Sequence, residues 1–393
     1  PCSIHRAGGR TLMASDRGLE ERLLALWDHL GLGVAHIATQ MPADIAGLVR
    51  TAAERVGGIV LPGYHPTGWA DVVAERTDAV LAALDRLPAL PAVSLPAANG
   101  AYAGIRYTVQ GSGPPLVLLP FFLAASQWEP AIPALTQRFT VIVLGGRHLG
   151  GVAALEDRAA GRSYQAMART LWDRMEVEHD DTVLDVGCGS GALDRLLAKR
   201  VPNGRIVATD VNRFLLREAA ALNGGSARIT FEQANAEALP FAAASFDVAF
   251  SITVLEECDA GRALSELHRV VRPGGRVGVV VRAIDLPQWW HLDLPPEVKR
   301  KAEIPPPSVG AGGVADASLY RRMQQAGFRE IAGFPALVTF DNPTGPIWHY
   351  REDHVLAQLT DEEALAWHRA ADAAREAGLL FMAHPLHCAV GTK

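Results

Sequence analysis

Residues 183–191 read Val-Leu-Asp-Val-Gly-Cys-Gly-Ser-Gly, a short apolar run followed directly by a glycine-rich stretch. The apolar run predicts a buried strand, and the leucines that recur after it predict a helix over Ala192–Arg200. Glycine suits the connection because a side chain would block the approach of a ligand to the backbone. A strand, a glycine loop and a helix in this order direct free N–H groups at a ligand. The stretch therefore predicts a nucleotide-type binding site.

The next predicted strand, Arg205–Thr209, leads to Asp210, nineteen residues after Gly191. An acidic side chain at this distance from a glycine loop commonly binds ribose hydroxyls. The loop alone is weak evidence for any one cofactor, because many dinucleotide-binding enzymes carry one. Short β-rich runs alternate with helical periodicities through most of the chain, which predicts an α/β fold with a mostly parallel sheet.

Three further stretches follow in order along the chain. Residues 231–241 read FEQANAEALPF after a third predicted strand, residues 245–251 read SFDVAFS as a fourth strand, and residues 267–281 read LHRVVRPGGRVGVVV as a helix, a tight turn and a fifth strand. With the glycine loop, these stretches make residues 160–393 resemble a class I S-adenosylmethionine-dependent methyltransferase, of the type that includes the ubiquinone and menaquinone C-methyltransferases. Another Rossmann-like nucleotide binder is the alternative.

The resemblance implies a fold class and a domain organisation. The fold is α/β, with a Rossmann-like seven-stranded methyltransferase sheet and helical cap insertions near residues 284–315 and 341–378. The cofactor is S-adenosyl-L-methionine. We expect this domain to span residues 156–393 and to follow a smaller α/β domain over residues 1–155.

The resemblance also implies roles for single residues. Asp185 and the glycine loop hold the methionine part of the cofactor, Asp210 binds both ribose hydroxyls, and Val211 lies beside the adenine. Asn235 and the Ala236 backbone bind the adenine edge. Relatives more often carry Asp at position 235, but an Asn carbonyl can still accept from the adenine amino group. The expected cofactor-binding set is Tyr164, Asp185, Gly187, Cys188, Gly189, Gly191, Asp210, Val211, Asn235, Ala236 and Ser251.

Methyl transfer from a sulfonium is an in-line displacement, in which the protein aligns the reactants and excludes water. A base is needed only when the acceptor starts protonated. Ser251 is expected to line the reaction centre, and residues 253–257, which read TVLEE, predict a helix start beyond it. Relatives often carry His where Glu257 stands. Glu256 or Glu257 is therefore a base, a substrate anchor, or an ordinary acidic residue at a helix N-terminus.

The two cap insertions are rich in aromatic residues. Residues 289–291 read Trp-Trp-His, and residues 348–354 read WHYREDH ahead of a predicted helix over residues 361–377. Aromatic side chains with polar tips suit a flat or apolar small molecule, and ordinary packing of the cap is the alternative. His291 and His349 are the base candidates in these insertions. Tyr164 is expected on a helix that covers the cofactor, where it either gates the site or simply packs.

The N-terminal third resembles a different fold. Residues 103–147 are similar to the opening part of an α/β-hydrolase and residues 21–87 to its closing part, so the order of the two parts is swapped. Gln40 stands where the serine of the GxSxG nucleophile elbow would lie, and His65 then has no nucleophile to serve. We expect a degenerate, non-catalytic domain that acts as a scaffold, a lid or a dimer surface.

Composition narrows the function further. The 393 residues include 43 Asp+Glu and 37 Lys+Arg, which gives a formal charge of −6. This acidic balance argues against a nucleic-acid-binding surface over the whole protein. No run approaches the ~20 apolar residues of a membrane span, and the first residues lack the apolar core of a secretory signal. Four scattered cysteines without a CxxC pair fit a reduced, cytoplasmic setting. His384 and His387 flank the last predicted strand without a third ligand, so no metal site is expected.

The leading hypothesis is a cytoplasmic S-adenosylmethionine-dependent methyltransferase that acts on a small, aromatic or apolar metabolite, as a monomer or a homodimer. One alternative is a hydrolase or a bifunctional enzyme that uses the N-terminal domain. Another is a non-enzymatic cofactor sensor or assembly partner. Methylation of RNA or protein is disfavoured by the acidic net charge.

Overall fold

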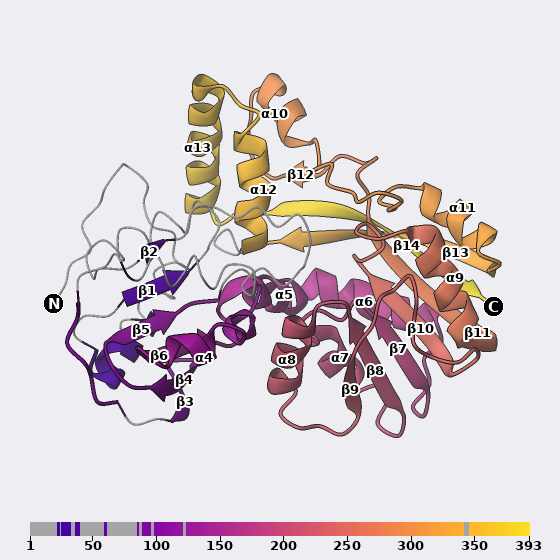
Figure 1. The fold of residues 1–393 in the computed structure, drawn as a ribbon. Helices are drawn as coiled ribbons and strands as arrows, with labels where there is room; N and C mark the ends of the chain where they lie inside the picture. The colour runs from indigo at the N-terminus through magenta and orange to yellow at the C-terminus, as the bar shows by residue number, and fades with distance from the viewer. Residues whose placement is uncertain are drawn as a thin grey trace. The chain divides into compact units, whose positions relative to one another are not determined.

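The computed structural model describes residues 22–23, 25–32, 36–39, 59–60, 85, 89–95, 98–120, 123–341 and 346–393. The chain divides into two compact units. The first takes in residues 1–65, 71–150 and 344–346, and the second takes in residues 66–70, 151–343 and 347–393. Each unit is built on its own β-sheet, and the second contains the predicted cofactor loop (Figure 1).

The first unit contains a six-stranded sheet in the order β2-β1-β5-β6-β4-β3. Its elements are β1 (His36–Thr39), β2 (Ile59–Val60), β3 (Asn99–Tyr102), β4 (Ile105–Gly111), β5 (Pro115–Leu118), η1 (Ala125–Trp128), α4 (Ile132–Leu135) and β6 (Thr140–Gly145). β3, β4 and β6 pair antiparallel, whereas β6, β5, β1 and β2 pair parallel. The early strands β1 and β2 thus extend the sheet beyond β5. Gln40 and His65 lie outside the described residues, so the degenerate-hydrolase interpretation stays a prediction.

The second unit contains the main sheet, in the order β12-β14-β11-β10-β7-β8-β9 with β13 also paired to β14. Its strands are β7 (Thr182–Val186), β8 (Arg205–Asp210), β9 (Ile229–Gln233), β10 (Phe246–Ile252), β11 (Val271–Arg282), β12 (Trp289–Trp290), β13 (Arg329–Phe340) and β14 (Met382–Thr392). β7 to β11 are parallel, and β14 runs antiparallel to β11 and β13. The seven long strands confirm the predicted Rossmann-like sheet, to which β12 adds two residues. Strand order reverses beside β7, which is where such sheets bind ligands.

Helices cover both faces of the main sheet. They are α6 (Arg162–Arg174), α7 (Ala192–Leu197), α8 (Arg213–Leu222), α9 (Ala260–Val270) and α11 (Ser318–Gln325), and α5 (Gly150–Ala160) leads into α6. Side chains alternate along β7, so that Val183 packs in a cluster with α6 and Leu184 packs in a cluster with α9 and α11. A parallel sheet buried on both faces presents open backbone only at its strand ends, and β7, β8 and β10 all end at one edge.

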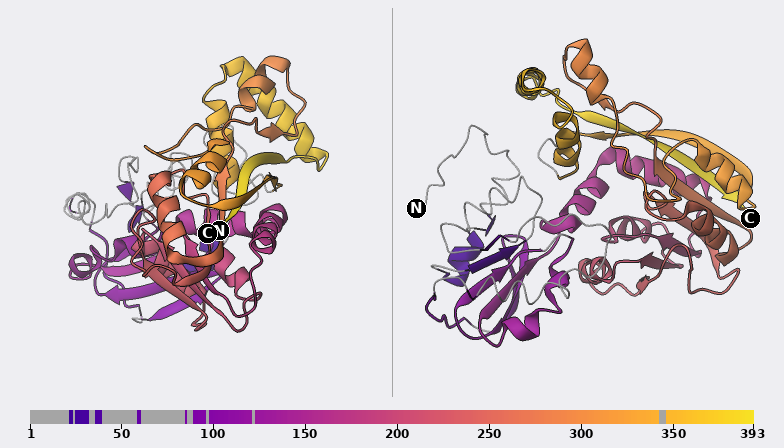
Figure 2. Two further views of the ribbon diagram at one scale, coloured as in Figure 1. Left: turned by 90° about the vertical axis from the view of Figure 1, so that its right-hand side faces the viewer. Right: turned by 45° about the horizontal axis from the view of Figure 1, so that its top comes forward.

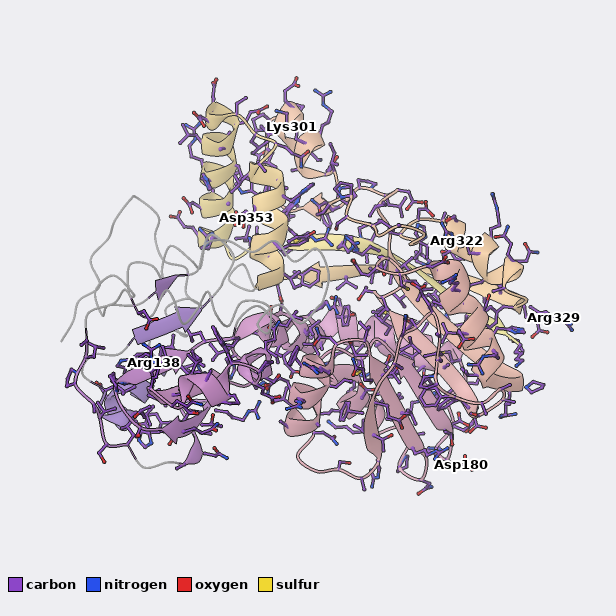
Figure 3. The ribbon with its side chains drawn as sticks, in the orientation of Figure 1. Arg138, Asp180, Lys301, Arg322, Arg329 and Asp353 are labelled. Carbon is purple, nitrogen blue, oxygen red and sulfur yellow. The ribbon has the colours of Figure 1, made fainter. Side chains whose placement is uncertain are left out.

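The cap insertions form one packed cluster. Helices α10 (Pro296–Ala302), α12 (Pro346–Leu356) and α13 (Asp361–Glu376) lie together where β13 ends and β14 begins (Figures 1 and 2). Trp290 of β12 packs edge-on against Trp348 and Trp367, with ring centroids 5.0 and 4.9 Å apart. Lys301 of α10 forms an ion pair of 2.6 Å with Glu363 of α13 (Figure 3). The edge-to-face tryptophans and this ion pair fix the cap helices to one another.

Two local predictions are wrong. Helix α7 ends at Leu197 rather than Arg200, because the Arg200 N–H donates to the Leu197 carbonyl in a tighter turn, shortly before Pro202 interrupts the chain. Residues 253–257 form a turn rather than a helix, and α9 begins only at Ala260, after the N-cap residue Asp259. Within the described part of the chain, no helix is both long enough and apolar enough to span a membrane.

Candidate active site

The glycine loop joins the end of β7 to α7 at the carboxyl edge of the main sheet. Gly187 has φ of +88°, where a side chain is strained, and a Cβ at this position would collide with the side chain of Val254. The N–H groups of Gly187 and Cys188 both donate to the Thr209 carbonyl, at 2.7 and 2.8 Å. Gly189 and Gly191 continue the loop into the first turn of α7. The loop therefore presents bare backbone held rigidly against the end of β8.

Asp210 ends β8 and faces the glycine loop. Its Oδ2 accepts the Gly189 N–H at 3.0 Å and its Oδ1 accepts the Asn212 N–H at 2.8 Å. Burial raises the pKa of Asp210, and these backbone hydrogen bonds oppose the rise. A carboxylate has about four lone-pair sites, so both oxygens retain capacity for further donors. The position suits the predicted contact with two ribose hydroxyls.

The residues predicted to contact adenine lie beside Asp210. Val211 leaves 55% of its surface exposed, which is unusual for an apolar residue next to a buried strand. The N–H of Ala234 donates to the Asp210 carbonyl at 3.1 Å, and this bond holds Asn235 and Ala236 close to the end of β8. The exposed Asn235 side chain accepts one backbone N–H at 2.9 Å through Oδ1. Its amide NH₂ remains available to a ligand.

Asp185, the last acidic residue of β7, lies against Asp194 of α7, and both are buried. A side-chain hydrogen bond joins the two carboxyl groups, and it lowers the pKa of Asp194 while it raises that of Asp185. Burial raises the pKa of Asp194 to about 7. The pKa of Asp185 is raised well above its usual range, mainly by burial and also by the charge of Asp194. Burial likewise raises the pKa of the nearby Cys188 thiol, which excludes a thiolate here. The carboxyl pair forms a proton-holding group beneath the loop.

Replacing Asp194 by the isosteric, uncharged Asn tests this protonation. The pKa of Asp194 is raised on folding, so the folded state binds more protons than the unfolded state, and stability falls as pH rises from about 4 to about 7. We therefore expect the free energy of unfolding of Asp194→Asn, relative to that of the unaltered protein, to rise with pH across this interval by at most about 1.4 kcal/mol per pH unit. The melting temperatures of the two proteins, measured at each pH, report this difference. Asp180→Asn, at the exposed far end of β7 (Figure 3), is the control. A pH-independent difference for Asp194→Asn would contradict the assignment.

Tyr164 and Ser251 approach the site from α6 and β10. Tyr164 is buried, and burial raises its pKa against the opposing effects of the Arg158 guanidinium and a hydrogen bond with the Thr253 side chain. Thr253 has φ of +57°, a strained conformation for a branched side chain and one that concentrates at functional sites. The Ser251 hydroxyl donates to the Val186 carbonyl at 2.8 Å. Ser251 therefore ties β10 to β7 and has no free proton for a ligand.

Two adjacent glutamates follow Thr253, and the turn places their side chains in different environments. Glu256 is fully buried, and its Oε1 accepts the Arg282 N–H at 2.7 Å. Its Oε2 has no partner among the described residues, and burial raises the pKa of Glu256 to about 7. The Glu257 side chain is 49% exposed and lies 3.8 Å from the Arg282 guanidinium. Of the two candidates, Glu256 is therefore the buried carboxyl with an oxygen that has no partner among the described residues, and Glu257 is the half-exposed one.

The two histidines predicted as bases both belong to the cap. His291 stacks on Phe381 with ring centroids 4.8 Å apart, and its Nδ1 lies 2.8 Å from the Leu379 carbonyl. It lines a cavity of about 630 Å³ between β12, α10 and α13, to which no residue of the glycine loop contributes. His349 lies in α12, and its side chain is outside the described part of the structure.

The last strand carries two histidines with different environments. His387 lies 2.8 Å from Asp285 and 3.2 Å from the Tyr320 hydroxyl, so both of its ring nitrogens have partners. His384 is only 4% exposed, and neither of its ring nitrogens has a partner among the described residues. Among those residues no group of three His, Cys, Asp or Glu is placed to hold a metal ion.

Comparison with known proteins places this site in a family context. A family profile described as a methyltransferase domain matches residues 183–275. The chain is 38% identical over 120 residues to the ubiquinone/menaquinone biosynthesis C-methyltransferase UbiE of Hahella chejuensis, covering 28% of this chain and 48% of that protein. It is 30% identical over 207 residues to the O-methyltransferase resE of Aspergillus sclerotiorum, a match that covers 50% of this chain and 73% of that protein. It is 36% identical over 140 residues to a malonyl-[acyl-carrier protein] O-methyltransferase of Pseudescherichia vulneris, a match that covers 34% of this chain and 53% of that protein. In two of these three, the match spans about half of the relative's length.

Proposed function

This chain belongs to the class I S-adenosylmethionine-dependent methyltransferases, and from that premise we propose that it transfers a methyl group from S-adenosylmethionine to a small-molecule acceptor. The observation that carries the proposal is the position of Asp210, whose carboxylate faces the bare backbone of the glycine loop. The loop would hold the methionine part, Asp210 the ribose, and Val211 with Asn235 the adenine. When bound, S-adenosylmethionine supplies an electrophilic methyl group on a sulfonium.

The residues around this edge are arranged to bind, orient and dehydrate the reactants. Tyr164 and Thr253 close the site from α6 and from the turn after β10, where their hydrogen bond fixes both side chains. A rigid, water-poor site of this kind favours in-line displacement, because the acceptor is aligned before the reaction begins. S-adenosylmethionine held by the glycine loop and Asp210 would supply its methyl carbon to the acceptor atom aligned in this site, and its sulfur would keep the electron pair of the broken carbon–sulfur bond.

We propose Glu256 as the group that takes a proton from the acceptor. Its free Oε2 is buried next to the turn, and its Oε1 is held by the Arg282 N–H, so the carboxyl is oriented. A pKa of about 7 suits a base at neutral pH, because the group is partly ionised and still binds a proton well. Proton transfer to Glu256 removes the positive charge that methylation would otherwise leave on the acceptor atom.

A small aromatic or apolar acceptor is the substrate class that we propose. One similar protein is named for ubiquinone and menaquinone biosynthesis, which supports this class without establishing it.

The experiment uses S-adenosylmethionine labelled at its methyl carbon and a deproteinised cell extract as the source of acceptors. We expect label to enter the small-molecule fraction while S-adenosylhomocysteine forms in equal amount. Titration calorimetry with S-adenosylhomocysteine provides an independent measure of cofactor binding. Binding without transfer to any fraction would favour a non-enzymatic cofactor sensor, and absence of binding would contradict the proposed function.

A further inference from the structure

Basic side chains from four separate elements gather near the proposed reaction centre. They are Arg158 of α5, Arg282 at the end of β11, Arg351 of α12 and His384 of β14. The guanidinium groups of Arg351, Arg282 and Arg158 all act on His384. Burial, together with these three charges, holds the pKa of His384 well below its usual range. Arg158 also lies over the ring of Tyr164, whose pKa it lowers while the Glu256 carboxylate raises it. The basic cluster therefore adjoins both the cofactor side and the proposed base.

Arg282 is the one member of the basic cluster whose charge is balanced. Its guanidinium lies 3.7 Å from Glu256 and 3.8 Å from Glu257, and it also donates to the Ser308 carbonyl and hydroxyl. Because it faces two carboxylates, Arg282 serves as a structural ion-pair partner. The remaining positive charge resides on Arg158 and Arg351.

Arg351 is the most deeply buried arginine of the basic cluster, with 6% of its surface exposed. Its Nη1 donates to the neutral Gln288 carbonyl oxygen at 3.3 Å. No carboxylate among the described residues lies within ion-pair distance of it. Burial, together with Arg282 and Arg158, lowers its pKa to about 10, so Arg351 still carries its charge at neutral pH. An unpaired buried charge is costly, and such a charge is typically retained where a ligand supplies the partner.

Arg158 and His384 are likewise left with unused donors. The Arg158 guanidinium carbon lies 5.1 Å from the centre of the Tyr164 ring, and its Nε is buried without a hydrogen-bond partner among the described residues. Both ring nitrogens of His384 are buried and unpartnered in the same sense. Buried polar atoms are normally hydrogen-bonded, so several orphaned atoms in one place indicate a missing polar ligand.

We propose that the methyl acceptor carries a carboxylate, which binds to Arg351 and Arg158 beside His384 while the rest of the acceptor lies toward Glu256. This inference rests on the proposed function and names the substrate class for the same site. A carboxylate matches the planar fork of an arginine through two parallel hydrogen bonds. It accepts the donors that Arg158 and Arg351 leave unused, and the His384 ring supplies one more. The carboxylate acts as an anchor and is not itself methylated.

The test measures binding of matched acids and amides to the protein saturated with S-adenosylhomocysteine. The probes are benzoate, phenylacetate and octanoate, each paired with its neutral carboxamide, and binding is followed by calorimetry. We expect at least one acid to bind about 10-fold or more tightly than its amide, since a buried charged pair contributes more than about 1.4 kcal/mol. Arg351→Met should remove this preference, and Arg351→Lys should restore part of it because it retains the charge.

The control variant is Arg300→Met, an exposed position on the cap helix α10. It should bind acids and S-adenosylhomocysteine as the unaltered protein does, and Arg351→Met should still bind S-adenosylhomocysteine within about twofold. Equal affinity for acids and amides, unchanged acid affinity in Arg351→Met, or no acid binding at all would overturn the anchor. Failure of the unaltered protein to bind S-adenosylhomocysteine would instead contradict the proposed function.

Discussion

Replacing Asp210 by Ala is expected to weaken S-adenosylhomocysteine binding by about 100-fold or more. The carboxylate is proposed to accept both ribose hydroxyls, and each hydrogen bond to a charged group contributes about 1.5–3 kcal/mol. The substitution also leaves the N–H groups of Gly189 and Asn212 without their acceptors, at 3.0 and 2.8 Å in the intact site. Loop order and ribose contact are therefore lost together. Titration calorimetry of the purified variant measures the effect.

Two companion variants separate the ribose contact from the support of the loop. Asp210→Asn keeps one side-chain oxygen for a backbone N–H but loses the charge, and it should fall between Ala and the unaltered protein. Asp180→Ala removes a carboxylate in the exposed turn before β7, the strand next to β8, at the opposite edge of the sheet from Asp210, and should leave affinity unchanged. Equal affinity of Asp210→Ala and the unaltered protein would refute the ribose assignment.

Replacing Glu256 by Gln is expected to lower the rate of methyl transfer by about 100-fold to 10,000-fold, the usual range for loss of a general base. The amide cannot take the proton, although it keeps the size of the side chain and can still accept the Arg282 N–H. Because burial raises the pKa of Glu256 to about 7, the unaltered rate should rise with pH below about 7 and level off above it. The measurement is S-adenosylhomocysteine formation with the extract fraction that supports turnover, between pH 5.5 and 9.

Glu257→Gln is the matched control, because it removes a carboxyl one residue away whose side chain is half exposed. Its rate should stay within about threefold of the unaltered value, since exposed charges contribute little. S-adenosylhomocysteine should bind equally to both variants. An unchanged rate in Glu256→Gln would contradict its role as the base, and a fall in rate confined to Glu257→Gln would assign that role to the exposed residue.

The cofactor side of the site could be predicted from the sequence because its information is local. Gly187, Gly189 and Gly191 follow the strand directly, and Asp210 ends the next strand, so the β7-loop-α7-β8 order brings them together at one edge. Each of these residues is close in sequence to the element that positions it. The alternation of short β-rich runs with helical periodicities likewise predicted an α/β fold with a mostly parallel sheet.

The acceptor side could not be predicted in the same way. Glu256 and Glu257 are adjacent and chemically identical, and only the turn that starts at Thr253 decides which one is buried. Arg158, Arg351 and His384 come from three elements separated by long stretches of chain, so no spacing in the sequence signals that they meet. The aromatic run at residues 289–291 predicts a base at His291, but His291 and both tryptophans line a cavity in the cap to which the glycine loop does not contribute.

The central claim is that S-adenosylmethionine lies along the carboxyl edge of the main sheet with its sugar held by one carboxylate. A crystal structure of the protein with S-adenosylhomocysteine tests this claim most directly. We predict both ribose hydroxyls within hydrogen-bond distance of the Asp210 carboxylate and the amino-acid part against the glycine loop. Side chains filling that crevice, or the ligand bound elsewhere with Asp210 contacting only Gly189 and Asn212, would contradict the account.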